Sequence, residues 1–141
     1  MADAALVRVR HCGAAIFCRR APERCPLCGH PLSGAGLSAA PVRLPSPFRH
    51  GHRQPRTFLL RPTAGTFLGG YDGNGDLHVG ITNSNGVVYN YSAEGVVREA
   101  AGWEQCISVP LVQPDVHGLL QHWDELLEEF SMGETWLPHR Y

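Results

Sequence analysis

A chain of 141 residues with 43% hydrophobic residues is long enough for a domain with a buried core, which excludes a wholly disordered protein. No stretch reaches the 18 or so apolar residues of a membrane span, and the first residues lack the apolar run of a signal peptide, so we expect an intracellular protein of the cytoplasm or nucleus. The net charge of −1 hides an asymmetry: residues 1–71 carry ten Arg against two acids, and residues 72–141 carry two Arg against eleven.

The amino-terminal segment, residues 1–30, contains four of the five cysteines. Without a secretory signal, such cysteines are reduced thiols or metal ligands and do not form a disulfide framework. Short apolar runs lie on either side of Cys12, and Gly13 follows it, a pattern that predicts a small hairpin closed by a tight turn. We therefore expect a zinc-knuckle-like segment over residues 1–30.

The strongest local motif is Cys25-Pro26-Leu27-Cys28-Gly29. Two thiolates three positions apart, on a turn opened by Pro and closed by Gly, point at one centre, as they do in a zinc knuckle. A closed structural zinc site needs four ligands. The predicted ligands are Cys12, Cys18, Cys25 and Cys28, with His11 and His30 as alternatives for the fourth.

Two other interpretations of the cysteine cluster stay open: reduced thiols without metal, and a redox pair. A redox Cys-x-x-Cys motif normally opens a helix after a strand, and no helical pattern follows Gly29. We therefore favour structural Zn²⁺ as the cofactor. Zinc binding is then expected to supply most of the folding free energy of this small segment, on the order of 10 kcal/mol.

The rest of the chain divides by composition into a linker and a main body. Residues 31–56 are rich in Pro, Gly, Ser and Ala, which predicts a linker that runs over the surface. Residues 57–141 are expected to form a β-rich domain with a carboxy-terminal helix. Its predicted strands are Thr57–Leu60, Thr66–Leu68, Leu77–Thr82, Val87–Ser92 and Cys106–Val112. The third and fourth form the clearest hairpin, because Asn85-Gly86 accepts the left-handed conformation of a tight turn.

A helix is predicted from Asp115 to Phe130, where apolar residues recur at three- and four-residue spacing and share one face. Pro114 and Asp115 suit its start. Its far end carries four carboxylates that oppose the helix dipole, so a basic neighbour is expected, and the arginines of the first half are the candidates. The basic and acidic halves of the chain are expected to neutralise each other on folding, or between two copies. The arginines are not interleaved with aromatic residues, so we expect no nucleic-acid partner.

The best functional hint is a histidine on one strand of the predicted hairpin and an asparagine on the other. With a tight turn between the strands, His78 and Asn90 can lie on one face near the same end. An imidazole held by an amide oxygen has the orientation that a cysteine hydrolase needs in its base. The alternative is a half-buried histidine that is hydrogen-bonded for structural reasons only.

The chain resembles the makorin ring finger 2 opposite-strand protein family along nearly its whole length. The matching stretches are residues 59–63, 65–68, 71–73, 76–83, 85–92 and 136–141, together with His11-Cys12 and Cys25-Pro26-Leu27-Cys28. Runs of this length are specific. The resemblance implies membership of the family and no particular activity.

A second resemblance covers about 20 residues: His78-Val79-Gly80-Ile81, Gly86 to Tyr91, and a later Gly-Val look like the histidine strands of circularly permuted papain-like folds. These include the PPPDE peptidases and the lecithin:retinol acyltransferase-like enzymes. The resemblance implies that His78 is the base and Asn90 a second polar residue. The nucleophilic Cys of such folds opens a later helix. Opposite-strand relatives continue past Tyr141, so the resemblance implies a shortened form that lacks this Cys.

We therefore expect an α+β protein: a zinc-knuckle hairpin, then an antiparallel sheet packed on one amphipathic helix, as an incomplete permuted papain-like fold. Cys106 lies in an apolar strand and is expected to be a buried thiol. The first functional hypothesis is a non-catalytic binding or regulatory module that acts on a protein partner and on no membrane. The alternative is a papain-like thiol hydrolase or acyltransferase that uses His78 and Asn90 with a cysteine absent from this chain. A third is a nonproductive splice product that exposes apolar surface.

Overall fold

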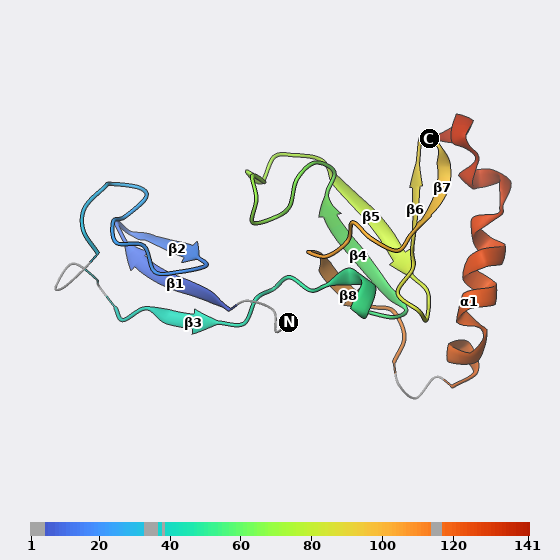
Figure 1. Cartoon of the computed structure of the whole chain (residues 1–141), viewed down its shortest axis with the longest axis horizontal. Helices are drawn as coiled ribbons and strands as arrows, with labels where there is room; N and C mark the ends of the chain where they lie inside the picture. Colours follow the sequence, from blue (N-terminus) through green and yellow to red (C-terminus); the bar gives the residue numbers. More distant parts are fainter. Residues whose placement is uncertain (1–4, 33–36, 38, 114–116) are drawn as a thin grey trace. The chain divides into compact units, whose positions relative to one another are not determined.

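The computed structural model describes residues 5–32, 37, 39–113 and 117–141. The chain forms two compact units, Met1–Pro47 and Phe48–Tyr141, which are described separately below. Both are built from antiparallel strands, and the second also carries an α-helix, as Figure 1 shows. The chain is therefore an α+β protein. Within the described residues, no helix is both long and apolar enough to cross a membrane.

The amino-terminal unit is a three-stranded sheet in the order β2-β1-β3. Its strands are β1 Leu6–His11, β2 Ala14–Cys18 and β3 Val42–Leu44. The predicted hairpin is confirmed: β1 and β2 are joined by Cys12 and Gly13, both at positive φ, 53° and 71°. This is the geometry of the two-residue turns that match the twist of a hairpin. The core consists of Val9, Ile16, Cys25 and Leu32.

The segment predicted as a linker, residues 31–56, contains regular structure. Its β3 pairs with β1, and the short 3-10 helix η1, Gly51–Arg53, belongs to the second unit, so the boundary between the units falls between Pro47 and Phe48. Because Pro41 and Pro45 flank β3, composition alone predicts no strand there. An edge strand accepts prolines at its ends, since one side of it makes no ladder hydrogen bonds.

The carboxy-terminal unit holds a five-stranded antiparallel sheet in the order β7-β6-β5-β4-β8. Its strands are β4 Thr57–Pro62, β5 Leu77–Thr82, β6 Val88–Ser92, β7 Gly95–Glu99 and β8 Ile107–Pro110. The predicted β5–β6 hairpin is confirmed. The strand predicted at Thr66–Leu68 is absent: Thr66 makes only isolated bridges, to Gly69 and Gly70, because the segment folds back on itself in a tight turn.

One face of this sheet carries the core of the unit, formed by Leu59, Val88, Trp103 and Cys106, all completely buried. Trp103 comes from the β7–β8 connection and lies over Gly80, where a Cβ atom would approach its ring to 3.0 Å. A glycine in the middle of a strand therefore makes room for the largest side chain of the core.

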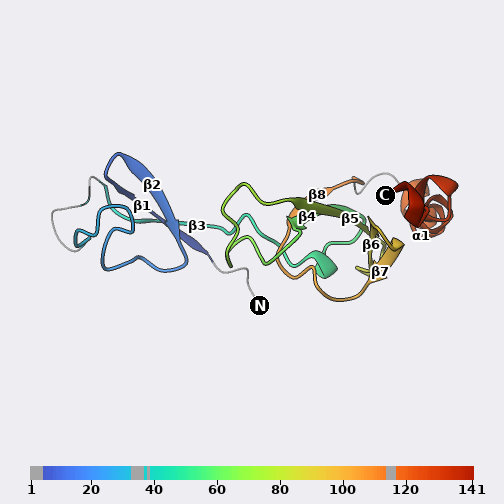
Figure 2. The same ribbon diagram turned by 90° about the horizontal axis from the view of Figure 1, so that it is seen from above.

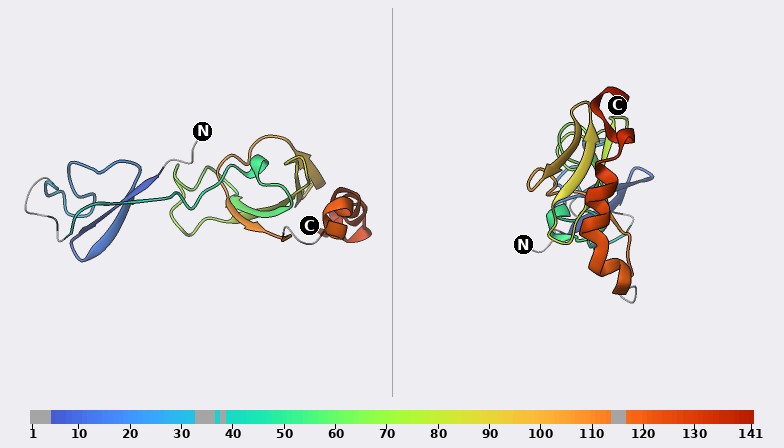
Figure 3. Two further views of the ribbon diagram at one scale, coloured as in Figure 1. Left: turned by 90° about the horizontal axis from the view of Figure 1, so that it is seen from below. Right: turned by 90° about the vertical axis from the view of Figure 1, so that its right-hand side faces the viewer.

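The other face of the sheet is covered in part by α1, His117–Ser131. Figure 2 and the right-hand view of Figure 3 show α1 alongside β6 and β7. Trp123 Nε1 donates to the carbonyl of Thr82 at 3.0 Å, and Asp124 accepts from the amide and hydroxyl of Ser84. The predicted helix is confirmed in type and position, and its predicted start at Pro114 and Asp115 lies outside the described residues. Two 3-10 turns follow: η2 Glu134–Trp136 and η3 Pro138–Arg140.

Candidate metal centre

Four potential metal ligands meet at one end of the amino-terminal unit: His11, Cys12, Cys25 and Cys28. One ligand atom from each lies within 4.8 Å of every other. His11 is the last residue of β1, and Cys12 is in the turn that follows, so the β1–β2 hairpin supplies two ligands. The Cys25–Cys28 turn supplies the other two. The sequence pattern thus brings two turns together at one point.

The Cys25–Cys28 turn has the backbone of a metal knuckle. The amide of Gly29 donates to the carbonyl of Cys25 at 2.8 Å, and Gly29 has a φ of 74°, which glycine adopts without strain. Burial raises the pKa of the Cys25 thiol, but the backbone amides of Cys28 and Leu27 point at its sulfur and lower the pKa to about 6. The turn therefore favours a thiolate, which is the form that binds zinc.

The distances between ligand atoms can be compared with the edges of a zinc tetrahedron. Zinc–sulfur bonds of about 2.3 Å and zinc–nitrogen bonds of about 2.05 Å give a sulfur–sulfur edge of about 3.8 Å and a sulfur–nitrogen edge of about 3.5 Å. The Sγ atoms of Cys12 and Cys25 are 3.9 Å apart, and Cys28 Sγ lies 3.5 Å from His11 Nδ1. Cys12 Sγ is closer to His11 Nδ1, at 2.9 Å. Two of these three distances match the edges of a zinc tetrahedron, and the third is shorter than an edge. The donor set and these two distances fit a zinc ion.

The two remaining predicted ligands, Cys18 and His30, lie outside this group. Cys18 pairs with Val7, four rungs of the ladder from the His11–Ala14 pair, which is roughly 13 Å along the strand, and it packs against the core. His30 Nδ1 lies 3.4 Å from Cys28 Sγ, close to a sulfur–nitrogen edge of the tetrahedron, but it does not belong to the group of four whose ligand atoms all lie within 4.8 Å of one another. The structure thus groups Cys12, Cys25 and Cys28 with His11, one of the alternatives for the fourth ligand. Strand register is the signal that distinguishes His11 from Cys18.

The second pair singled out by the sequence, His78 and Asn90, also meets. His78 Nε2 donates to Asn90 Oδ1 at 2.9 Å, and Asn90 Nδ2 donates to Glu99 Oε2 at 2.9 Å. The same carboxylate oxygen accepts from Trp103 Nε1 at 2.7 Å. Asn90 is buried and His78 is half-buried. Among the described residues, none hydrogen-bonds Nδ1 of His78, so this nitrogen is the one that faces away from the network.

Cys106, the one cysteine of the carboxy-terminal unit, is a core residue. Its side chain is completely buried, and its Sγ donates to the carbonyl of Trp103 at 3.2 Å. Burial raises the pKa of this thiol to about 11. A buried neutral thiol is a poor nucleophile, as the sequence predicts for Cys106.

Comparisons with known proteins relate the whole chain to one family. Residues 4–32 match the family described as DUF4796 N-terminal, and residues 41–141 match DUF4796 C-terminal. The chain is similar to the human MKRN2 opposite strand protein, with 54% identity over 140 residues, which cover 99% of this chain and 63% of that protein. The chain thus spans less than two thirds of the length of this curated relative. No solved structure matches.

Proposed function

The chain belongs to the DUF4796 family, and we propose that this family member is a zinc-binding protein whose amino-terminal unit is held together by one structural Zn²⁺. The ligands are His11, Cys12, Cys25 and Cys28. The observation that carries the proposal is the convergence of their four ligand atoms within 4.8 Å. Three thiolates and one imidazole form a donor set that is typical of structural zinc.

A structural role is favoured over a catalytic one for two reasons. Four protein ligands close a tetrahedral site, whereas a catalytic zinc keeps a position open for water or substrate. The core around the site is also small, since Val9, Ile16, Cys25 and Leu32 are its buried members among the described residues. A core of this size contributes little free energy of folding without a further constraint, and a metal supplies one.

The test is the zinc content of the purified chain, measured by elemental analysis. We expect one zinc ion per chain, which Cys25→Ser abolishes. The matched control is Cys18→Ser, which changes the same residue type outside the cluster and is expected to keep the ion. His11→Ala is expected to weaken zinc binding at least tenfold, and His11→Cys to restore it. A zinc-free wild type would overturn the proposal. If Cys18→Ser loses zinc while His11→Ala keeps it, the fourth ligand is Cys18 and not His11.

We further propose that the carboxy-terminal unit of this chain acts as a non-catalytic binding or regulatory module. The argument is that His78 is held by Asn90 as a base would be, while the cysteine of that unit is buried in the core and protonated. A base without an accessible thiol activates no thiolate.

A second candidate function is a thiol hydrolase or acyltransferase of papain-like type. The hydrogen bond from His78 Nε2 to Asn90 Oδ1 supports it, because it directs Nδ1 outward as the proton acceptor. A thiol-reactive acyl probe separates the two functions. Labelling of the wild-type chain that disappears in His78→Ala supports the enzyme. Equal labelling of the wild type and His78→Ala, or no labelling, leaves the binding module.

A further inference from the structure

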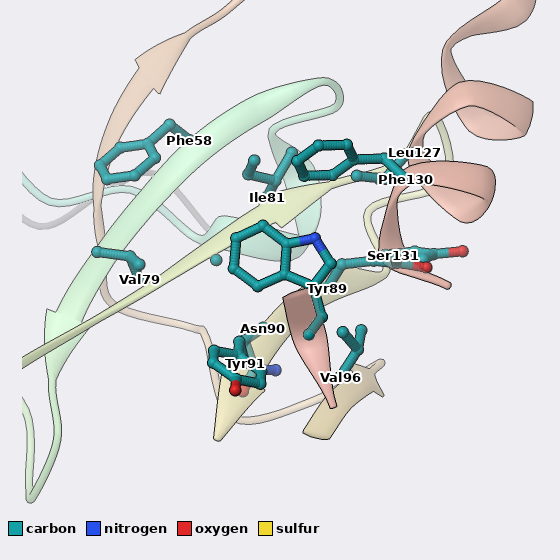
Figure 4. Close-up of a pocket in the computed structure, with 12 residues that line it drawn as sticks. Phe58, Val79, Ile81, Tyr89, Asn90, Tyr91, Val96, Leu127, Phe130 and Ser131 are labelled. Atoms are coloured by element: carbon teal, nitrogen blue, oxygen red, sulfur yellow. The ribbon is translucent and has the colours of Figure 1, made fainter. Parts of the chain in front are cut away.

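An apolar groove runs between α1 and the sheet of the carboxy-terminal unit. Figure 4 shows Phe58, Val79 and Ile81 on its floor, with Leu127 and Phe130 of α1 at its side. Trp136 also lines the groove. The groove contains a cavity of about 140 Å³. This is smaller than the roughly 300–1,000 Å³ of sites for small ligands, so it suits an inserted side chain better than a cofactor.

The apolar floor continues beyond the groove toward the edge strand β8. Strand register places Val109 beside Phe58 and Ile107 beside Leu60, and paired residues share one face of an antiparallel sheet. Val79 is 45% exposed and Val109 50% exposed, values that are high for valines on a sheet face. Because α1 lies alongside β6 and β7, as Figure 2 shows, the face over β4 and β8 is not covered by it.

The shape of this surface indicates what fits it. The sheet provides a floor, and the flank of α1 with Leu127 and Phe130 provides a wall; Phe130 is 64% exposed. A segment that fills such a slot must be apolar on two adjoining sides. An amphipathic helix with a broad apolar stripe meets this requirement, and helix-in-groove binding uses apolar anchors of this kind.

The charges beside the wall indicate the polar face of the occupant. Glu125 and Glu129 directly precede Leu126 and Phe130 on α1, and the Glu125 side chain is 83% exposed. A second copy of this chain that inserted its own α1 would bring the glutamates of that helix to an apolar floor, where unpaired carboxylates are costly to bury. A helix with basic residues along one border instead pairs with these glutamates.

We propose that this groove, bounded by the β4–β5 floor and the Phe130 flank of α1, receives an amphipathic helix with a basic border. We propose that the helix comes from the part of longer family members that this sequence does not match. The human relative has about 80 residues outside the match, since the 140 matched residues make up 63% of it. A segment of that length is ample for a helix that spans the groove, because each residue adds about 1.5 Å.

The test mixes this 141-residue chain with the unmatched portion of the human relative, produced as a separate polypeptide, and measures binding by calorimetry. We expect binding that Val79→Asp weakens at least tenfold, because a carboxylate then faces the apolar floor. Phe130→Ala is a second variant and is expected to weaken binding as well. The matched control is Val42→Asp, which changes an exposed valine of the amino-terminal unit and is expected to bind like the wild type.

Absence of binding to the wild-type chain overturns the proposal, as does binding that neither Val79→Asp nor Phe130→Ala weakens. Light scattering of the wild-type chain alone tests the other occupant. A dimer that Val79→Asp converts to a monomer would assign the groove to a second copy and would also overturn the proposal. Zinc content is measured on the same samples, so a failed metal site and a failed groove are distinguished.

Discussion

Asn90 links three polar side chains in the interior of the carboxy-terminal unit. It accepts from His78 and donates to Glu99, whose carboxylate also accepts from Trp103. We predict that Asn90→Ala lowers the free energy of unfolding by about 1–3 kcal/mol, because it leaves buried polar atoms without partners. Urea denaturation followed by tryptophan fluorescence measures this, with the exposed turn residue variant Asn85→Ala as the control. Equal stability of both variants would contradict the prediction.

Gly86 shows a second residue-scale constraint, a close approach of two backbones. It has a φ of 78°, and a Cβ atom there would lie 1.9 Å from the carbonyl oxygen of His52. His52 itself is fixed, since its Nδ1 donates to the carbonyl of Gly86 and its Nε2 accepts from the amide of Trp103. The β5–β6 turn therefore packs directly on η1.

We predict that Gly86→Ala destabilises the chain by at least about 2 kcal/mol, the sum of left-handed strain and overpacking. Gly73→Ala is the matched control, because Gly73 also has a positive φ, 90°, but open space around it. The difference between the two midpoints of thermal unfolding isolates the contact with His52. A Gly86→Ala variant as stable as Gly73→Ala would show that the turn can move away.

At the scale of elements, α1 is attached to the sheet by a charged contact as well as by apolar packing. Glu128 accepts from Arg98 Nη2 at 2.5 Å and from the Tyr89 hydroxyl at 2.6 Å. These hydrogen bonds, Arg98 first, lower the pKa of Glu128. The predicted basic neighbour is present, but the expected source, the arginines of the first half, is wrong for Glu128: Arg98 comes from strand β7 of the acidic half of the chain.

A lowered folded-state pKa gives the sign of a pH effect. The stabilisation from Glu128 is complete above its unfolded-state pKa of about 4.3 and is lost as the pH falls through the lower folded-state value. We predict that Glu128→Gln is less stable than the wild type at pH 7 and that the difference shrinks below about pH 4. Thermal unfolding at both pH values measures this. A difference that is the same at both would assign the effect to packing alone.

The elements also show which parts of the fold sequence reasoning can reach. The β5–β6 hairpin and α1 follow from local signals, the Asn85-Gly86 turn and a helical apolar spacing. Two strands, β3 and β7, are missed: β3 has only three residues, and β7 is specified by its pairing with β6. For the candidate metal cluster, the sequence predicts Cys12, Cys25 and Cys28 and leaves the fourth ligand open among Cys18, His11 and His30, because the choice between Cys18 and His11 depends on hairpin register.

At the scale of the whole molecule, the two units are stabilised by different means. The amino-terminal unit combines a small core with the candidate metal cluster, whereas the carboxy-terminal unit has a five-stranded sheet around the buried Trp103. Within the described residues, the second unit holds no such cluster of ligands. Removal of zinc is therefore expected to act on one unit and to leave the other folded.

The position of the tryptophans allows this to be measured, because all three, Trp103, Trp123 and Trp136, belong to the carboxy-terminal unit. We predict that, when a strong chelator removes zinc, the NMR amide resonances of Val9 and Ile16 move to random-coil positions. The wavelength of the tryptophan fluorescence emission is expected to stay the same. Zinc added back is expected to restore the resonances, since the ion supplies the folding free energy of the first unit. A tryptophan shift at the same chelator concentration would mean that the units unfold together, and unchanged resonances of Val9 would mean that its core is stable without a metal.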